Sequence, residues 1–94
     1  MMATTVRIPT PLRRVTAGKD AVSVSGVTVA ENLSDLETQF PGIKARIIDD
    51  AGELHRFVNI YINGEDVRFL QGMQTAVKDG DELSIVPAVA GGAA

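Results

Sequence analysis

The sequence predicts an α+β roll in which one main helix covers one face of a mixed sheet of four to five strands. Segments that alternate polar and apolar residues, as half-buried strands do, occur near both ends of the chain and in its middle. A single amphipathic segment with helical periodicity lies between them. Because one helix can cover only one face of a sheet, the other face is expected to be open. The length of 94 residues fits one domain.

Two strands are expected at the start of the chain. Residues 4–8 alternate, with Val6 and Ile8 facing inward, and Pro9 ends the strand because proline has no amide hydrogen to donate. Residues 21–25 alternate in the same way and form the second strand. The short loop between these segments favours a hairpin.

A helix is expected to begin after Thr28. The Thr28 hydroxyl can accept from the backbone of Glu31, and the Glu31 carboxylate can reach back, which is the spacing of a capping box. Apolar residues then recur at steps of four, three and four, the pattern of one helical face: Val29, Leu33, Leu36 and Phe40. Pro41-Gly42 ends the helix, and a short turn over residues 43–50 buries two isoleucines, Ile47 and Ile48.

The strongest strand pattern covers residues 57–63, followed by Asn63-Gly64, a dipeptide typical of tight hairpin turns. Residues 67–69 are therefore expected to return as a short strand. After a turn at Asp79-Gly80, residues 82–86 form the last strand. The predicted order of strand, strand, helix, strand, short strand, strand is that of a β-grasp arrangement.

Composition and charge exclude several classes of function. The chain has no cysteine, which excludes disulfides, thiolate catalysis and cysteine zinc sites. A net charge of −3 argues against nucleic-acid binding, which depends on clustered lysine and arginine. No apolar run approaches a membrane span, and the N-terminus lacks the apolar region of a signal peptide, so a cytoplasmic location is expected.

Charge is unevenly distributed along the sequence. Residues 1–48 carry six basic and four acidic side chains, whereas residues 49–94 carry three basic and eight acidic ones. The acidic second half suits a basic protein partner, since such asymmetry speeds encounter. The alternative interpretation is a solvated surface that keeps the protein soluble.

Residues for catalysis are scarce. His55 is the only histidine, so a metal site would need carboxylate partners, and none has ligand spacing around it. The pairs Asp49-Asp50 and Glu65-Asp66 consist of neighbours whose side chains diverge, so they are expected to be solvated loop residues rather than a general acid and base. The scattered glycines form no phosphate-binding loop. We therefore expect a protein without an active site of its own and without a bound metal.

The C-terminal residues differ from the rest of the chain. A β-grasp domain is expected over residues 1–87 and an extended tail over residues 88–94, whose members are small or apolar: Ala88, Val89, Ala90, Gly91, Gly92, Ala93 and Ala94. Such a tail suits threading into a narrow cleft. A diglycine lets another backbone approach closely and leaves a following carboxylate unhindered. A frayed terminus or a cloning remnant is the alternative interpretation of the two glycines alone.

A docking patch is expected on the open face of the sheet. Phe57 and Tyr61 lie opposite the inward residues of their strand, and Val86 lies opposite the inward residues of the last strand. Together they would form an apolar partner-binding patch. Scattered surface, or packing under the segment 43–53, is the alternative.

The sequence resembles the ubiquitin-like sulfur carrier family, which includes ThiS, MoaD and CysO, and within it the CysO members most closely. The resemblance covers nearly the whole chain. It rests on residues 8–10, Leu12-Arg13, the run His55-Arg56-Phe57-Val58-Asn59-Ile60-Tyr61, residues 65–69, Asp79-Gly80-Asp81, and the run from Pro87 to Gly92.

The resemblance implies a chemistry. In this family a separate ubiquitin-activating-type adenylating enzyme uses ATP to form an acyl adenylate at the last glycine, and sulfur converts it to a thiocarboxylate. By position, that carboxyl belongs to Gly92. A pyridoxal-phosphate (PLP)-dependent cysteine synthase would supply the acceptor for cysteine or a related sulfur amino acid, and a JAMM-type metalloprotease would release the product. The carrier alone would bind no cofactor.

One departure from the family pattern concerns the end of the tail. Mature carriers end at the diglycine, whereas Ala93-Ala94 follow it here. A peptidase is expected to remove them, and the metalloprotease is the first candidate. The alternatives are a MoaD-like small subunit of molybdopterin synthase, a ThiS-like thiamin sulfur carrier, and a ubiquitin-like protein modifier.

Overall fold

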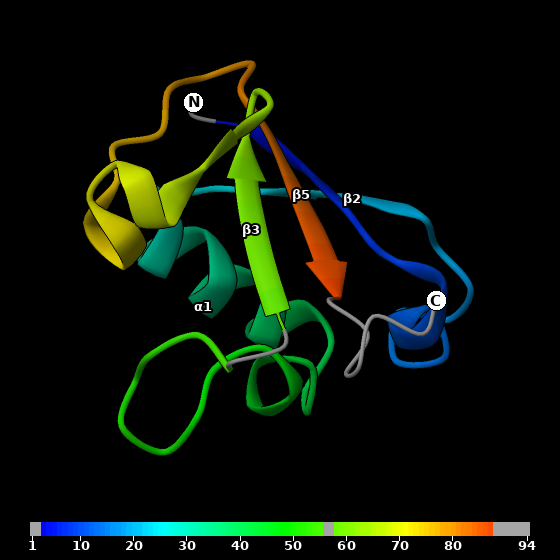
Figure 1. Ribbon diagram of the computed structural model, residues 1–94. Coiled ribbons are helices and arrows are strands. Elements are labelled where there is room, and N and C mark those ends of the chain that lie inside the picture. The colour runs from blue at the N-terminus through cyan, green and yellow to red at the C-terminus, as the bar shows by residue number, and fades with distance from the viewer. Residues whose placement is uncertain (1–2, 56–57, 88–94) are drawn as a thin grey trace.

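The fold is a five-stranded mixed sheet with one α-helix against one face, as expected for a β-grasp fold (Figure 1). The computed structural model describes residues 3–55 and 58–87. The strands are β1 (Thr4–Arg7), β2 (Ala21–Val24), β3 (Val58–Ile62), β4 (Glu65–Asp66) and β5 (Glu82–Pro87), and the helix is α1 (Val29–Gln39). Short 3₁₀ turns connect them: η1 (Thr10–Leu12), η2 (Lys44–Arg46), η3 (Val67–Phe69) and η4 (Gly72–Gln74).

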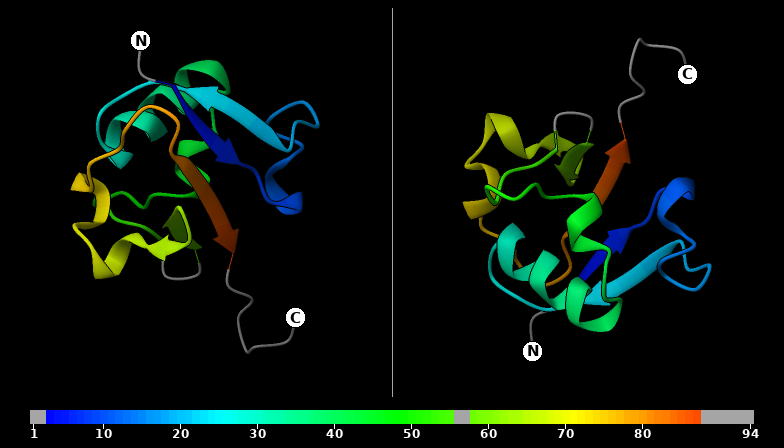
Figure 2. Two further views of the ribbon diagram at one scale, coloured as in Figure 1. Left: turned by 90° about the horizontal axis from the view of Figure 1, so that it is seen from above. Right: turned by 90° about the horizontal axis from the view of Figure 1, so that it is seen from below.

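The first and last strands of the described chain lie side by side in the middle of the sheet. The strand order is β2-β1-β5-β3-β4, and β1 and β5 run parallel while the other neighbours are antiparallel. The first two strands form the predicted hairpin. Figure 2 shows α1, the one α-helix of the described residues, on one side of this sheet.

The helix begins at the predicted cap, with one difference. The Thr28 hydroxyl accepts from the Glu31 amide at 3.2 Å. The Glu31 carboxylate accepts from the amide of Val27 at 3.0 Å, one residue before the one a capping box uses. Of the predicted apolar stripe, Val29, Leu33 and Leu36 are buried, and Phe40, the residue that ends the helix, is partly buried.

The core lies between α1 and the inner face of the sheet. Ile47 and Ile48 are buried beside η2, as predicted, together with Ile43. Inward residues alternate along each long strand, which confirms the predicted facing of β1 and β3. The buried apolar residues of the strands are Val6, Val22, Val24, Val58, Ile60, Ile62, Leu83 and Ile85.

The predicted return strand over residues 67–69 is wrong. The turn at Asn63-Gly64 has the expected positive φ angles, 49° and 91°, but pairing stops after Glu65 and Asp66. The Asp66 carboxylate then accepts from the Arg68 amide at 2.9 Å and begins the 3₁₀ turn η3. The aspartate cap therefore overrides the alternating pattern. Its carboxylate accepts from a backbone amide that would have no hydrogen-bond partner in a strand at the edge of the sheet.

The last strand ends one residue later than predicted, at Pro87. The turn before it is confirmed, with φ of 90° at Gly80. The predicted tail, residues 88–94, lies outside the described residues, so the division of the chain at residue 87 stays a prediction.

Candidate functional site

The candidate site is the end of β5, the point from which the predicted tail continues. Val86 lies opposite Asn59, and Pro87 lies opposite Val58, the first residue of β3. The tail residues predicted to act, Ala88, Val89, Ala90, Gly91 and Gly92, lie outside the described residues. The structure therefore defines the base of the site and not its reactive end.

Arg68 holds the strand against which β5 ends. Its guanidinium donates to the Val58 carbonyl oxygen at 2.7 Å, to the Asn59 side-chain oxygen at 2.7 Å and to the His55 carbonyl oxygen at 3.3 Å. Val58 and Asn59 are the first two residues of β3, whereas β4 pairs only with the last two, Tyr61 and Ile62. Sequence reasoning missed Arg68 because it placed the residue in a strand. The Asp66 two positions earlier, a residue type that often begins turns, was the available signal.

The open face carries two of the three residues predicted to form the docking patch. Tyr61 lies opposite Ser84 and is half-buried, while Val86 has 40% of its surface exposed. Both point away from the buried residues of their strands. Phe57 lies outside the described residues. Partner binding by this patch stays a prediction.

The opposite end of β5 is fixed by polar contacts. The carboxylate of Asp81 accepts from the Lys78 amide at 2.8 Å and from the Asn63 side chain at 3.0 Å. These two hydrogen bonds hold the pKa of Asp81 below its ordinary value of 3.8. Arg7 and Glu82 form an exposed ion pair at 3.5 Å on the neighbouring strands.

Two other residues considered for catalysis, Asp49 and His55, contact the backbone. The Asp49 carboxylate accepts from the amides of Ala51 and Glu53, at 2.9 and 3.1 Å, and so shapes its own loop. A ring nitrogen of His55 lies 3.0 Å from the carbonyl oxygen of Ala45. Within residues 3–55 and 58–87, no three histidine, aspartate or glutamate side chains are grouped as metal ligands. In the same residues no helix has the length and apolar character to cross a bilayer.

Residues 6–92 match the ThiS family, so the match extends from the middle of β1 to the second glycine of the tail. The chain is a member of the ThiS family. The predicted family and fold are therefore confirmed.

Known proteins resemble the chain, two of those described here over nearly its whole length. It is 55% identical over 93 residues to the sulfur carrier protein CysO of Mycobacterium tuberculosis, which covers 97% of this chain and 100% of that protein. A crystal structure of the BexX/CysO complex of Amycolatopsis orientalis contains a chain that matches with a TM-score of 0.91 at 53% identity. That match covers 96% of this chain and all of the other. Small archaeal modifier protein 3 of Haloferax volcanii is 46% identical over 65 residues, 69% of this chain and 70% of its own.

Proposed function

We infer that this chain is a sulfur carrier protein of the CysO type. The observation that carries this conclusion is the 55% identity to CysO, which covers the whole of that protein and 97% of this chain. The family match that ends at Gly92 supports the diglycine as the functional end. The MoaD-like and ThiS-like alternatives are disfavoured, because near-complete coverage at this identity is found with CysO.

We propose that the carboxyl of Gly92 carries the sulfur. A carboxylate is a poor electrophile, so it must first gain a leaving group. Its oxygen would attack the α-phosphorus of ATP on a separate adenylating enzyme, releasing pyrophosphate. A donor at the oxidation level of sulfide would then attack the carbonyl carbon, forming the C–S bond while the C–O bond to AMP breaks. No oxidant or reductant is needed, and the product is a thiocarboxylate.

In this scheme the carrier contributes a surface for binding its partners and a C-terminal residue that bears the sulfur. We propose that it has no active site and binds neither ATP nor PLP alone, and that its open sheet face, with Tyr61 and Val86, meets the adenylating enzyme. The relative in complex with BexX supports the existence of a partner protein. The acceptor would be an activated amino acid held by a PLP-dependent cysteine synthase, and a JAMM-type metalloprotease would release the product.

Ala93-Ala94 would control this reaction. While Gly92 is in a peptide bond to Ala93, it has no free carboxylate for adenylation. Removal of the two alanines would create that carboxylate next to residues with little side-chain bulk. We propose that the form ending at Gly92 is the active carrier.

The test compares three proteins in ATP–pyrophosphate exchange with the adenylating enzyme of the same host: the full chain, the chain ending at Gly92, and that shorter chain with Gly92→Val. We expect exchange only with the second. The valine variant should fail because a β-branched side chain restricts the backbone and crowds the carbonyl. With a sulfide donor, intact mass should show one oxygen replaced by sulfur. Exchange by the full chain without loss of Ala93-Ala94 would refute the role of Gly92.

A second function, protein modification, is favoured by the 46% identity to a small archaeal modifier protein. In that case a lysine amine, rather than sulfide, would attack the activated Gly92. Denaturing gels of host lysate would separate the two: a ladder of isopeptide-linked conjugates indicates a modifier, whereas a single thiocarboxylate species indicates a carrier.

A further inference from the structure

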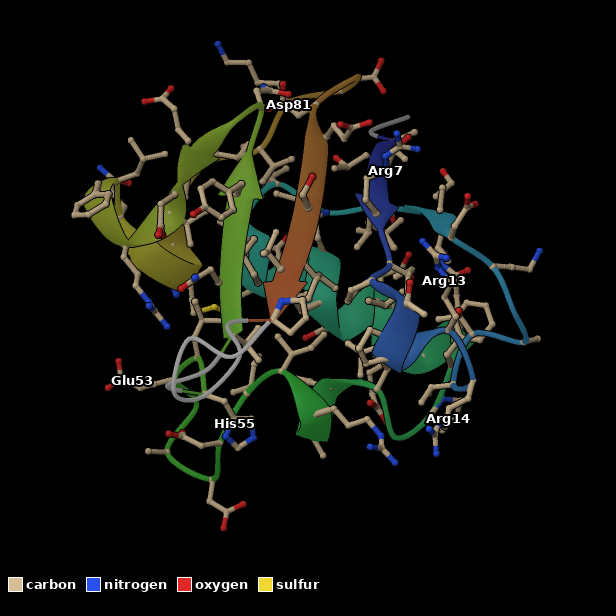
Figure 3. All side chains as sticks on the ribbon, turned by 45° about the vertical axis from the view of Figure 1, so that its right-hand side comes forward. Arg7, Arg13, Arg14, Glu53, His55 and Asp81 are labelled. Carbon is tan, nitrogen blue, oxygen red and sulfur yellow. The ribbon has the colours of Figure 1, made fainter. Side chains whose placement is uncertain are left out.

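Two loops of opposite charge lie on either side of the end of β5. Because β1 is parallel to β5, the loop that follows β1 begins at the same end of the sheet as the C-terminal end of β5. Because β3 is antiparallel to β5, the loop that precedes β3 lies at the same end of the sheet. In the sheet β5 lies between these two strands, so the loops flank its end. Figure 3 shows Arg13 and Arg14 on one side of it and Glu53 and His55 on the other.

The loop after β1, residues 9–20, forms the basic side. It holds Arg13, Arg14 and Lys19 against one acidic residue, Asp20. Arg13 is half-buried and donates to the Ile8 carbonyl oxygen at 3.1 Å, so this residue is partly structural. Arg14 is exposed, and among the described residues its guanidinium makes neither a hydrogen bond nor an ion pair.

The loop before β3, residues 49–55, forms the acidic side. Asp49, Asp50 and Glu53 are exposed, and only Asp49 uses its carboxylate within the loop. The Glu53 carboxylate makes no ion pair in the part of the chain that is described. The preceding turn η2 has two basic residues. Its Lys44 amine donates to the Ser34 hydroxyl of α1 at 3.3 Å and is thereby directed to the helix, whereas Arg46 is exposed and adds one positive charge next to the acidic side.

The two charged sides are far enough apart to act separately on a partner. Adjacent strands lie about 4.8 Å apart, so β1 and β3 are separated by roughly 10 Å where the loops begin. The Debye length at physiological salt is about 8 Å, which means that neither side cancels the other. The residues after Pro87 are small, alanine, valine and glycine, and offer no polar side chain that could orient a docked carrier.

We propose that residues 13–19 and 49–53 form a bipolar rim around the end of β5, and that this rim docks on a protein with the opposite polarity. Such a partner has acidic groups facing Arg14 and basic groups facing Glu53 beside the opening that admits the tail. Matching of the two polarities fixes the rotation of the carrier about its tail axis, which the tail itself cannot fix. The proposal rests on the proposed function in that the tail enters a partner.

The test uses the full chain and BexX of Amycolatopsis orientalis, the partner seen with a 53% identical CysO. Association is measured by stopped flow at low and at high salt for Arg14→Glu, Glu53→Arg and the double swap. The double swap keeps the net charge at −3 and reverses the rim. We expect each single variant to associate roughly threefold to fivefold more slowly at low salt, and the double swap about tenfold more slowly, with the differences shrinking at high salt.

The matched control makes the same charge changes at the other end of the molecule. Lys78→Glu with Glu65→Arg lies near the Asp81 end of β5, opposite the rim in Figure 3. We expect its association rate to equal that of the unaltered chain. A double swap that restores the normal rate would show that only net charge matters and would overturn the proposal. So would an equal effect of the control pair, or no association of the unaltered chain.

The outcome is separable from that of the proposed function. Pyrophosphate exchange by the chain ending at Gly92 reports the chemistry, whereas the polarity dependence of association reports the rim. If the chain is adenylated normally but the double swap does not change the association rate, the proposed function is supported and the rim proposal is refuted. If exchange fails but the double swap still slows association, the rim is supported and the proposed chemistry is refuted.

Discussion

Gly26 is a position where one added carbon should strongly destabilise the protein. Its φ is +134°, and a Cβ built there would lie 2.7 Å from the Glu31 Cβ and 3.0 Å from the Asn32 side-chain nitrogen. The chain passes close to the first turn of α1 at this point, so neither neighbour can move without disturbing the helix. We expect Gly26→Ala to lower the free energy of unfolding by about 3 kcal/mol, from backbone strain plus overpacking, measured by urea denaturation.

Gly18→Ala is the matched control for this prediction. Gly18 also has a positive φ, +85°, but nothing lies within 4 Å of the added carbon. It should therefore show the strain alone, about 1 kcal/mol. Equal losses in the two variants would mean that the contact with α1 is unimportant.

Tyr61 tests the docking patch. Its ring lies on the face away from α1 and is only half-buried, so removing it should leave the core intact. Aromatic residues at interface centres typically contribute about 2 kcal/mol or more to binding. We expect Tyr61→Ala to weaken binding of the adenylating enzyme by about this amount, measured by calorimetry, with an unchanged circular dichroism spectrum.

Phe69→Ala provides the comparison, because it removes an exposed aromatic ring from the turn η3 and not from a strand of the sheet. Phe69 lies on η3 and has 87% of its surface exposed, the largest value among the large apolar residues described. Its removal should leave binding unchanged. If Phe69→Ala weakens binding and Tyr61→Ala does not, the enzyme contacts η3 rather than the predicted docking patch, and the prediction is wrong.

The alternation of polar and apolar residues was sufficient to predict which side of the sheet a strand residue faces, but not which side chains it contacts. The inward positions of Val58, Ile60 and Ile62 follow from the two-residue period of a strand, and the structure confirms them. The role of Arg68 was missed, because the alternating pattern over residues 67–69 concealed the turn that brings this residue to Val58 and Asn59.

The turn that follows α1 depends on an ionised carboxylate. Glu37 accepts from the amides of Gly42 and Lys44 at 2.9 and 2.8 Å. These two hydrogen bonds lower the pKa of Glu37 below its ordinary value of 4.5. A lowered pKa in the folded state contributes stability above the unfolded value of 4.5, and this contribution is lost as the pH falls through the folded pKa.

We therefore expect the free energy of unfolding to fall as the pH is lowered from about 6 to about 3, and to fall less in Glu37→Gln. The amide side chain keeps an oxygen that can accept but does not titrate. Urea denaturation at both pH values measures the difference. Asp81, whose pKa is also lowered, contributes in the same direction in both proteins, so the comparison isolates Glu37. Parallel losses in the two proteins would contradict the assignment.

Elements with strong local signals were predictable, and short ones were not. The stripe of α1 and its Thr28 cap are encoded within a few residues of each other. The segment 67–69 alternates like a strand, yet it has only one buried residue, Val67, and an aspartate directly before it. A 3₁₀ turn buries Val67 equally well and satisfies the backbone locally, so the shorter-range interaction prevailed.

The order of strands in the sheet lies beyond sequence reasoning of this kind. The parallel pairing of β1 with β5 joins residues more than seventy positions apart, and no local pattern specifies it. The same pairing changes the meaning of the uneven charge. A surface for a basic partner was one of two interpretations of the acidic second half. The fold places Glu53 at the same end of the sheet as Arg14 of the first half (Figure 3).

The central position of β5 also has a consequence for biosynthesis. Without β5, the chain has two separate two-stranded units, β1 with β2 and β3 with β4, that share no strand pairing. Isolated hairpins are at best marginally stable in water, and a pairing between distant segments must wait until both exist. The ribosome makes β5 last of the five strands, so an unfinished chain cannot assemble the sheet. A carrier with a complete open face has thus been synthesised at least to Pro87, the residue after which its tail begins.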